Sequence, residues 1–156
     1  MKLLPLYPTH GREVINDKGW VDWVLSRVLP QTNVYKLGSP YLRRYFVYDG
    51  RFGRVLVHRL MQPDADRHLH DHPWDAVFIV FGPGYLETTT EEGRPKAHWR
   101  GLRWLPSIRF HPAERPHRIE ALGGDSVWTI ALTTRHRRVW GYHTEDGWVP
   151  WTEYER

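Results

Sequence analysis

Hydrophobic and polar residues change their period along the chain near residue 40. Before that point, apolar residues recur three and four positions apart, which is the spacing of one face of a helix. They are Trp20, Val21, Val24, Leu25 and Val28. Asp17 is a suitable N-cap residue, and Pro30 ends the run. The pattern predicts a helix over residues 17–29, which we expect to pack outside the main body.

From about residue 43, short apolar runs alternate with turn signals. VLVHRLM has a period of two, AVFIVF is a continuous apolar run, and DGRFG, GPG and GGD are typical turns. About nine evenly spaced short strands are typical of a β-sandwich or barrel. We therefore expect an all-β domain over residues 43–156, with residues 1–42 as a helical or irregular extension that packs on it.

Length and composition narrow the class of protein. A chain of 156 residues is expected to form one domain, and the absence of cysteine excludes disulfides, thiolate metal sites and a cysteine nucleophile. No apolar run approaches the roughly 18 residues that cross a bilayer. The apolar stretch at the start, MKLLPLYPTHGREV, is too short for a signal peptide. These features favour a cytoplasmic protein without a membrane partner.

The net charge of +4 favours an anionic partner, either a small carboxylate or phosphate substrate or nucleic acid, although solubility alone explains an excess of this size. The basic run RHRR at residues 135–138 resembles a solvated strand end more than a nucleic-acid contact, so a nucleic-acid partner is not expected. The chain also has 10 histidines, a number that makes metal or proton chemistry worth testing.

The segment RHLHDHPWD carries the most informative pattern. His68, His70 and His72 are two residues apart, so on an extended backbone their side chains share one face. Two neutral imidazoles on one strand face can chelate one metal ion, and imidazole suits iron, zinc, copper and nickel. A further ligand must come from elsewhere, and His117 in HPAERPHRIE is the best candidate. The simpler alternative is a set of surface histidines in a polar loop.

These residues resemble the first motif of the cupin superfamily, G-x5-HxH-x3–4-E-x6-G. In one register the histidine pair is His68 and His70, Asp75 replaces the glutamate, and Gly82 is the final glycine. The resemblance implies a cupin fold, a double-stranded β-helix or jelly-roll barrel that binds metal. In this register Asp75 is a fourth ligand or accepts a hydrogen bond from an imidazole.

In the second register the pair is His70 and His72, Val77 takes the place of the acid, and Gly84 is the glycine. This version is similar to the thiol dioxygenases of the cysteine dioxygenase type, which have an HDH pair, lack the acidic ligand and hold ferrous iron with three histidines. GYLET after the strand is similar to their glycine-x-leucine turn.

The second cupin motif is degenerate here. Pro112, Glu114 and His117 match its PxGxxH spacing, with glutamate for glycine and Ala121 for asparagine. The resemblance covers residues 43–145. It implies His70, His72 and His117 as metal ligands, with His68 and Asp75 as alternates.

The function implied is that of a metal-dependent cupin, and we expect a non-haem Fe(II) dioxygenase acting on a small anionic substrate. The expected cofactor is one divalent transition metal, iron first, with zinc, manganese or nickel as alternatives. A metal-assisted isomerase, epimerase or lyase on the same scaffold, or a small-molecule-binding protein without catalysis, is the competing hypothesis. Cupins often pair, so a homodimer is expected.

Other residues are candidates for substrate contacts. His58 lies on the strand before the histidine cluster and is a candidate acid–base group, with a structural histidine as the alternative. The candidate anion-binding residues are Arg59 and Arg118. The candidate pocket walls are Tyr85, Trp104 and Trp128, for which ordinary core packing is the alternative.

Overall fold

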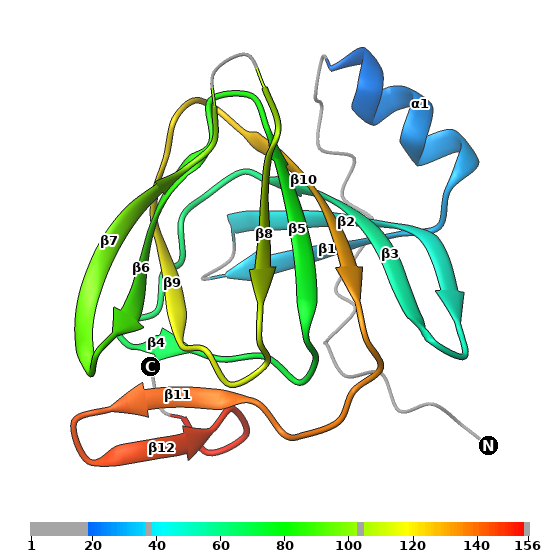
Figure 1. Cartoon of the computed structure of the whole chain (residues 1–156). Coiled ribbons are helices and arrows are strands. Elements are labelled where there is room, and N and C mark those ends of the chain that lie inside the picture. The colour runs from blue at the N-terminus through cyan, green and yellow to red at the C-terminus, as the bar shows by residue number, and fades with distance from the viewer. Residues whose placement is uncertain (1–18, 37–38, 103–104, 155–156) are drawn as a thin grey trace.

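Twelve short strands make up most of the chain described by the computed structural model, which covers residues 19–36, 39–102 and 105–154. They form two six-stranded antiparallel sheets that face each other (Figure 1). The first sheet has the order β1 (Gln31–Lys36), β2 (Ser39–Gly50), β3 (Gly53–Leu60), β10 (Val127–Thr133), β5 (Ala76–Phe81) and β8 (Ser107–His111). The second has the order β12 (Gly147–Pro150), β11 (Gly141–Thr144), β4 (Leu69–His70), β9 (His117–Leu122), β6 (Tyr85–Glu91) and β7 (Arg94–Arg100).

Buried and less buried side chains alternate along the strands, as the alternation of residues in the sequence predicted. In β5, Ala76, Phe78 and Val80 are buried, while Val77 and Ile79 are only half-buried. The buried side chains form two apolar clusters. One joins the two sheets around Tyr85 and Ile119, and the other lies on the first sheet around Trp74 and Phe78. Each large apolar side chain buried there stabilises the fold by roughly 1.5–3 kcal/mol.

Two turns show why glycine occupies their positions. The hairpin between β6 and β7 turns through Glu92 and Gly93, both with positive φ, which is the two-residue turn that matches the twist of a hairpin. Gly84 before β6 has φ +74°, and a Cβ there would lie 2.2 Å from the carbonyl oxygen of Arg100. Only glycine lets these two backbones approach.

The strands begin earlier in the chain than expected. β1 and the first residues of β2 pair with each other as part of the first sheet, and β2 crosses residue 43 without a break. The division of the chain into residues 1–42 and 43–156 stays a prediction about its domain organisation.

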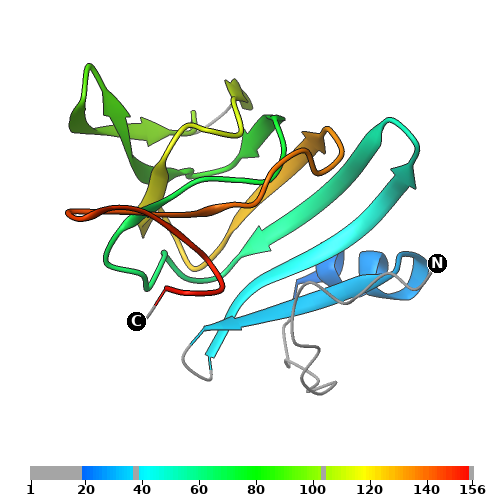
Figure 2. The ribbon, with the colours of Figure 1, turned by 90° about the horizontal axis from the view of Figure 1, so that it is seen from below.

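The helix, α1 (Trp20–Val28), lies on the outer side of the first sheet, away from the second sheet (Figure 2). The expected N-cap Asp17 lies outside the described residues. The helix docks through a buried carboxylate, Asp22, which accepts hydrogen bonds from the Arg43 guanidinium and the Tyr45 hydroxyl. Arg59 of β3 adds an ion pair at 3.5 Å. No helix in the described part of the chain has the length and apolar character needed to cross a membrane.

Replacing this carboxylate tests how the helix is held. Asp22→Ala is expected to lower the free energy of unfolding by about 3–5 kcal/mol, because it leaves the buried Arg43 guanidinium without its counter-charge. Urea denaturation followed by circular dichroism measures the loss. Asp49→Ala is the matched control, because Asp49 forms exposed ion pairs with Arg54 and Arg135 that contribute only about 0–1 kcal/mol. Equal losses in the two variants would contradict the role of Asp22.

Candidate metal centre

Strand pairing brings histidines from distant parts of the sequence together. In the second sheet β4 pairs with β9, and His70 lies directly opposite His117. Two residues further on, His72 is on the same side of the chain as His70, and its backbone N–H donates to the carbonyl of Ala113. The side chains of His70, His72 and His117 therefore converge from two segments about 45 residues apart in sequence.

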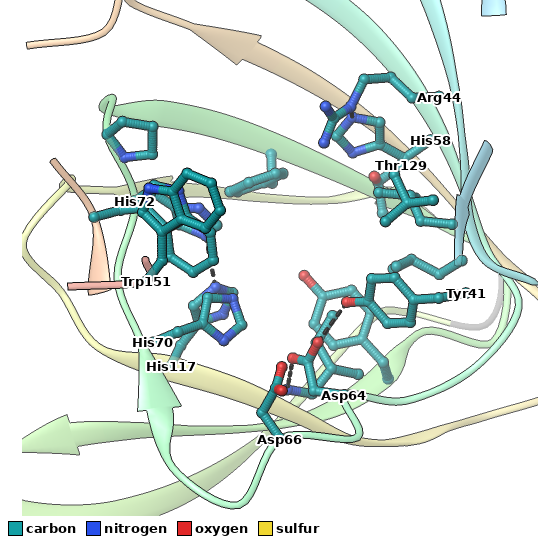
Figure 3. Close-up of a pocket in the computed structure, with 18 of the residues that line it drawn as sticks. Tyr41, Arg44, His58, Asp64, Asp66, His70, His72, His117, Thr129 and Trp151 are labelled. Atoms are coloured by element: carbon teal, nitrogen blue, oxygen red, sulfur yellow. Dashed lines mark hydrogen bonds between the residues drawn. The ribbon is translucent and has the colours of Figure 1, made fainter. Parts of the chain in front are cut away.

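The three imidazoles are close enough to hold one ion. The ring centroids of His70 and His72 each lie 4.8 Å from that of His117, and the Nε2 atoms of His72 and His117 are 2.7 Å apart. Potential ligand atoms of all three lie within 4.8 Å of one another. Figure 3 shows the three rings grouped on one wall of a cavity. Three imidazole nitrogen donors around one point are a set that suits iron, zinc, copper or nickel.

Aromatic neighbours fix the orientation of two of these rings. His72 stacks on Trp74 with the ring planes 11° apart and centroids 4.3 Å apart. The ring centroids of Trp140 and Tyr142 lie 6.1 and 6.0 Å from that of His70, which packs against both. Burial is the main cause that holds the pKa of His72 well below its usual range, and the neighbouring histidines add to it. The imidazole of His72 is therefore neutral near pH 7, as a metal ligand must be.

Glu87 of β6 orients His117. Its Oε1 lies 2.6 Å from Nδ1 of His117, so Nδ1–H donates to the carboxylate and Nε2 is left to face the other histidines. Glu87 is fully buried, and Arg100 and Arg109 lie 2.8 and 2.5 Å from its oxygens. Burial alone would raise the pKa of Glu87, but the hydrogen bond and charge of His117 and the charge of Arg109 outweigh it and hold that pKa well below its usual range.

A second group of potential ligands lies behind the first. Glu87, His111 and His117 have ligand atoms within 4.8 Å of one another and are all buried. Neither Glu87 nor His111 lines the cavity. Burial, with the charges of His117 and Arg109, lowers the pKa of His111 to about 2, so its ring is neutral. The group that contains His70 and His72 is the one that a substrate could reach.

Asp71, between the two cavity-facing histidines, points away from the cavity and fixes the C-terminal hairpin. Its buried carboxylate accepts from the backbone N–H of Gly141 at 2.8 Å and from Nε1–H of Trp148 at 2.9 Å. Arg138 forms an ion pair with it at 2.7 Å. The HDH segment therefore links the histidine cluster to β11 and β12.

The cavity has a volume of about 450 Å³, enough for a small molecule. Opposite the histidines, Arg44, His58 and Thr129 form its far wall (Figure 3). Nε–H of Arg44 donates to Nε2 of His58 at 3.2 Å. Burial first, and then the charge of Arg44, hold the pKa of His58 well below its usual range, so this ring is neutral.

The remaining walls are acidic on one side and aromatic on another. Asp64 accepts hydrogen bonds from the Tyr41 hydroxyl at 2.5 Å and from the backbone N–H of Ile119 at 2.7 Å. Asp66 lies beside it (Figure 3). The C-terminal segment contributes aromatic side chains, which are Trp140, Tyr142, Trp151 and Tyr154.

The structure separates the other candidate residues into two groups. His58 and Tyr85 line the cavity, whereas Arg59, Arg118 and Trp128 do not. Arg59 follows His58 in β3 and so points to the opposite face, where it packs over the ring of Trp128. Arg118 pairs with Glu120 and donates to backbone carbonyls before β4. These three residues correct the expected list of cavity contacts. Trp104 lies outside the described residues.

The two alternate ligands are also held away from the cluster. Asp75 accepts from the backbone N–H of Ala113 and from Arg137. Nδ1 of His68 lies 3.0 Å from the Tyr154 hydroxyl. The geometry favours the register His70 and His72, without Asp75, although the ligand assignment stays a prediction.

Four functional candidates were missed from the sequence: Arg44, Glu87, Arg109 and His111. Glu87 had a weak signal, because it alternates with Leu86 and Thr88 and shares the inward face with Tyr85 and Thr89. Arg44 had none that distinguished it from the other arginines.

Comparison with known proteins gives the fold. No family model matches the chain, and no curated protein matches it. A cupin-2 domain protein from Rhodospirillum rubrum is similar in structure with a TM-score of 0.56 at 10% identity, over 76% of this chain and 78% of that chain. HppE crystallised with Fe(II) has a TM-score of 0.53 at 16% identity, over 69% of this chain and 57% of that chain.

The capsular polysaccharide assembling protein CapF from Staphylococcus aureus also matches, with a TM-score of 0.52 at 14% identity over 70% of this chain and 29% of that chain. The chain thus spans a little over half of HppE and less than a third of CapF. These similarities confirm the expected fold class: the chain has the all-β cupin fold, with a short N-terminal helix.

Proposed function

We propose that this protein is a metal-dependent cupin enzyme, a non-haem Fe(II) dioxygenase that acts on a small anionic substrate. The observation that carries the proposal is the convergence of His70, His72 and His117 on one wall of a cavity of about 450 Å³. Three protein ligands leave coordination positions for substrate on the cavity side.

The donor set fits ferrous iron. The three ligands are imidazoles, His72 is neutral, and the Nδ1–H of His117 is held by Glu87 so that its Nε2 is available. When bound, a ferrous ion supplies the electron-transfer chemistry that dioxygen activation needs. HppE, which is similar in fold and was crystallised with Fe(II), supports iron as the first metal to test. The three-histidine set without Asp75 supports the likeness to the thiol dioxygenases.

The far wall supports an anionic substrate. Arg44 lines the cavity opposite the histidines, and a guanidinium there can pair with a carboxylate or phosphate group. Its Nε–H donates to Nε2 of His58 at 3.2 Å, so the guanidinium is positioned beside a neutral ring on the same wall. Arg44 therefore takes the role that we expected of Arg59 and Arg118. A substrate would lie between this wall and the metal.

The competing proposal is a metal-assisted isomerase, epimerase or lyase. Neutral, buried His58 lines the cavity and is a candidate proton acceptor in such a reaction. Dioxygen separates the two proposals, because only the first consumes it.

Metal binding is the first prediction. The purified protein is expected to bind one Fe(II) per chain under anaerobic conditions. His72→Ala and His117→Ala should each abolish stoichiometric binding, because two imidazoles do not complete the site. His98→Ala is the control, since His98 pairs with Glu91 on the β6–β7 hairpin. Isothermal titration and elemental analysis measure the stoichiometry, and full binding by His117→Ala would rule out the site.

The role of Glu87 gives the second prediction. Glu87→Gln is expected to weaken metal binding by about 10–100-fold, because the amide orients His117 less strongly than the carboxylate does. Competition with a chelator measures the affinity. Glu120→Gln is the control, because Glu120 lies on the same strand as His117 but pairs with Arg118 outside the cavity. Equal affinities for Glu87→Gln and the wild type would contradict the proposed orientation.

Oxygen consumption tests the reaction class. Iron-loaded protein is expected to consume dioxygen when offered a panel of small thiol carboxylates and other small anions, and Arg44→Met should raise KM at least tenfold with kcat less affected, because the anion loses its partner. An oxygen electrode measures the rate. Turnover of a candidate substrate without dioxygen would favour the isomerase or lyase instead.

A further inference from the structure

The first sheet has an apolar outer face, and beyond the helix α1 no described residue of the chain covers its β5 and β8 end. Across β3, β10, β5 and β8 the register aligns two rows of side chains that point away from the cavity. The first row is Val57, Ile130, Ile79 and Ile108. The second row is Val55, Leu132, Val77 and Phe110. Neither row contains a charged or polar residue, whereas an outer face in water normally carries polar side chains.

Four side chains of this face, on β8, β5 and β10, are well exposed. Ile108, Phe110, Leu132 and Phe81 are 38–68% exposed. We name the two rows, together with Phe81, the sheet face. A contiguous apolar surface of this kind marks an interaction site.

The helix α1 buries a charged side chain and exposes apolar ones, which is the reverse of the usual pattern. Its buried residue is the charged Asp22, while large apolar side chains point into solvent. They are Trp20, Trp23, Val24 and Val28, which are 39–76% exposed. We name these four the helix face. A surface helix normally buries its apolar side, so this orientation indicates that a second surface covers it.

We propose that the sheet face and the helix face bind each other across a two-fold axis, so that two copies of this chain form a dimer with α1 of each copy packed on β5 and β8 of the other. The strand order supports this arrangement. In the sheet, β3 and β5 flank β10 on either side, and β2 and β8 lie one strand further out.

Consider two copies whose outer faces oppose each other, with a two-fold axis that runs parallel to β10 midway between them. Rotation about this axis places β2 of one chain opposite β8 of the other, and β3 opposite β5. Asp22 fixes α1 to Arg43 of β2 and Arg59 of β3, so the helix face meets the partner's sheet at the uncovered end. The two helices then lie side by side in one layer between the two sheets, and the same surface is used twice, as a two-fold dimer requires.

The sheet face and the helix face together are large enough for a stable dimer interface. At these exposed fractions the aromatic and aliphatic side chains present on the order of 100 Å² each. The eight exposed residues together present several hundred Å² per copy, and the half-buried members of the two rows add to it. A standard interface needs roughly 800 Å² per partner.

The experiment measures the mass of the full chain in solution. Sedimentation equilibrium at micromolar concentration is expected to give twice the 18.6 kDa mass of the chain. Phe110→Glu and Trp23→Glu should each raise the dimer dissociation constant by about 100-fold or more, because each charge enters the interface twice. Phe52→Glu is the matched control and should leave the dimer intact, since Phe52 is exposed at the β2–β3 turn. Iron binding by each variant checks that it is folded.

A mixing experiment tests the reciprocal arrangement. Val28→Lys on the helix face and Ile108→Glu on the sheet face should each prevent homodimers. In a mixture they should form heterodimers, because one helix–sheet contact is then unaltered and the other joins opposite charges. Failure to form heterodimers would overturn the helix-on-sheet arrangement.

A monomeric wild type, or a dimer that resists Phe110→Glu and Trp23→Glu, would overturn the proposal as a whole. Removal of residues 1–18 identifies the other candidate occupant. If the wild type is monomeric and the shortened chain associates, the chain's own N-terminal segment covers the face instead.

Discussion

The antiparallel pairing of β4 with β9 is the constraint on which the candidate site depends. It is short, since β4 has only two residues, yet it places His70 opposite His117 and fixes the direction in which His72 follows. A shift of this register by one residue would turn the histidines to the opposite face of the sheet. The surrounding structure therefore has to specify this one pairing, and it does so from both sides: β9 also pairs with β6, and β4 also pairs with β11.

Buried carboxylates secure the three junctions that matter most. Glu87 joins β6 to His117, Asp71 joins the HDH segment to the C-terminal hairpin, and Asp22 joins the helix to the first sheet. Each is almost completely buried and each has an arginine partner. A buried charge with a missing partner is costly, so the loss of either partner is expected to destabilise the junction that the pair holds. They supply specificity of arrangement, while the apolar clusters supply most of the stabilisation.

The period of two in the strands predicted an all-β domain, and the period of two in HLHDH predicted that its histidines share a face. The cupin fold and the choice of His117 rested on the resemblance to the cupin motifs, because no local pattern joins segments about 45 residues apart. It did not predict the contacts that depend on pairing across the sheets. His58 and Arg59 are neighbours in a strand and cannot share a face, so alternation alone could have removed Arg59 from the cavity. The choice of Arg44 needed the register of β2 with β3, where Arg44 lies opposite His58. The helix was expected from its apolar positions, but the sequence did not show that the helix docks through Asp22 and leaves Trp20, Val24 and Val28 exposed.

The aromatic wall of the cavity comes from a different part of the chain than the metal ligands. Trp140, Tyr142, Trp151 and Tyr154 belong to the C-terminal segment, which Asp71 anchors through its backbone and ring contacts. The anchoring groups include a main-chain N–H, which every residue except proline offers. The chemistry of the ion and part of the shape of the space in front of it can therefore diverge separately in evolution: exchange of Trp151 or Tyr154 would alter which molecules fit, while the imidazoles, their carboxylate and the two rings beside His70 stay as they are.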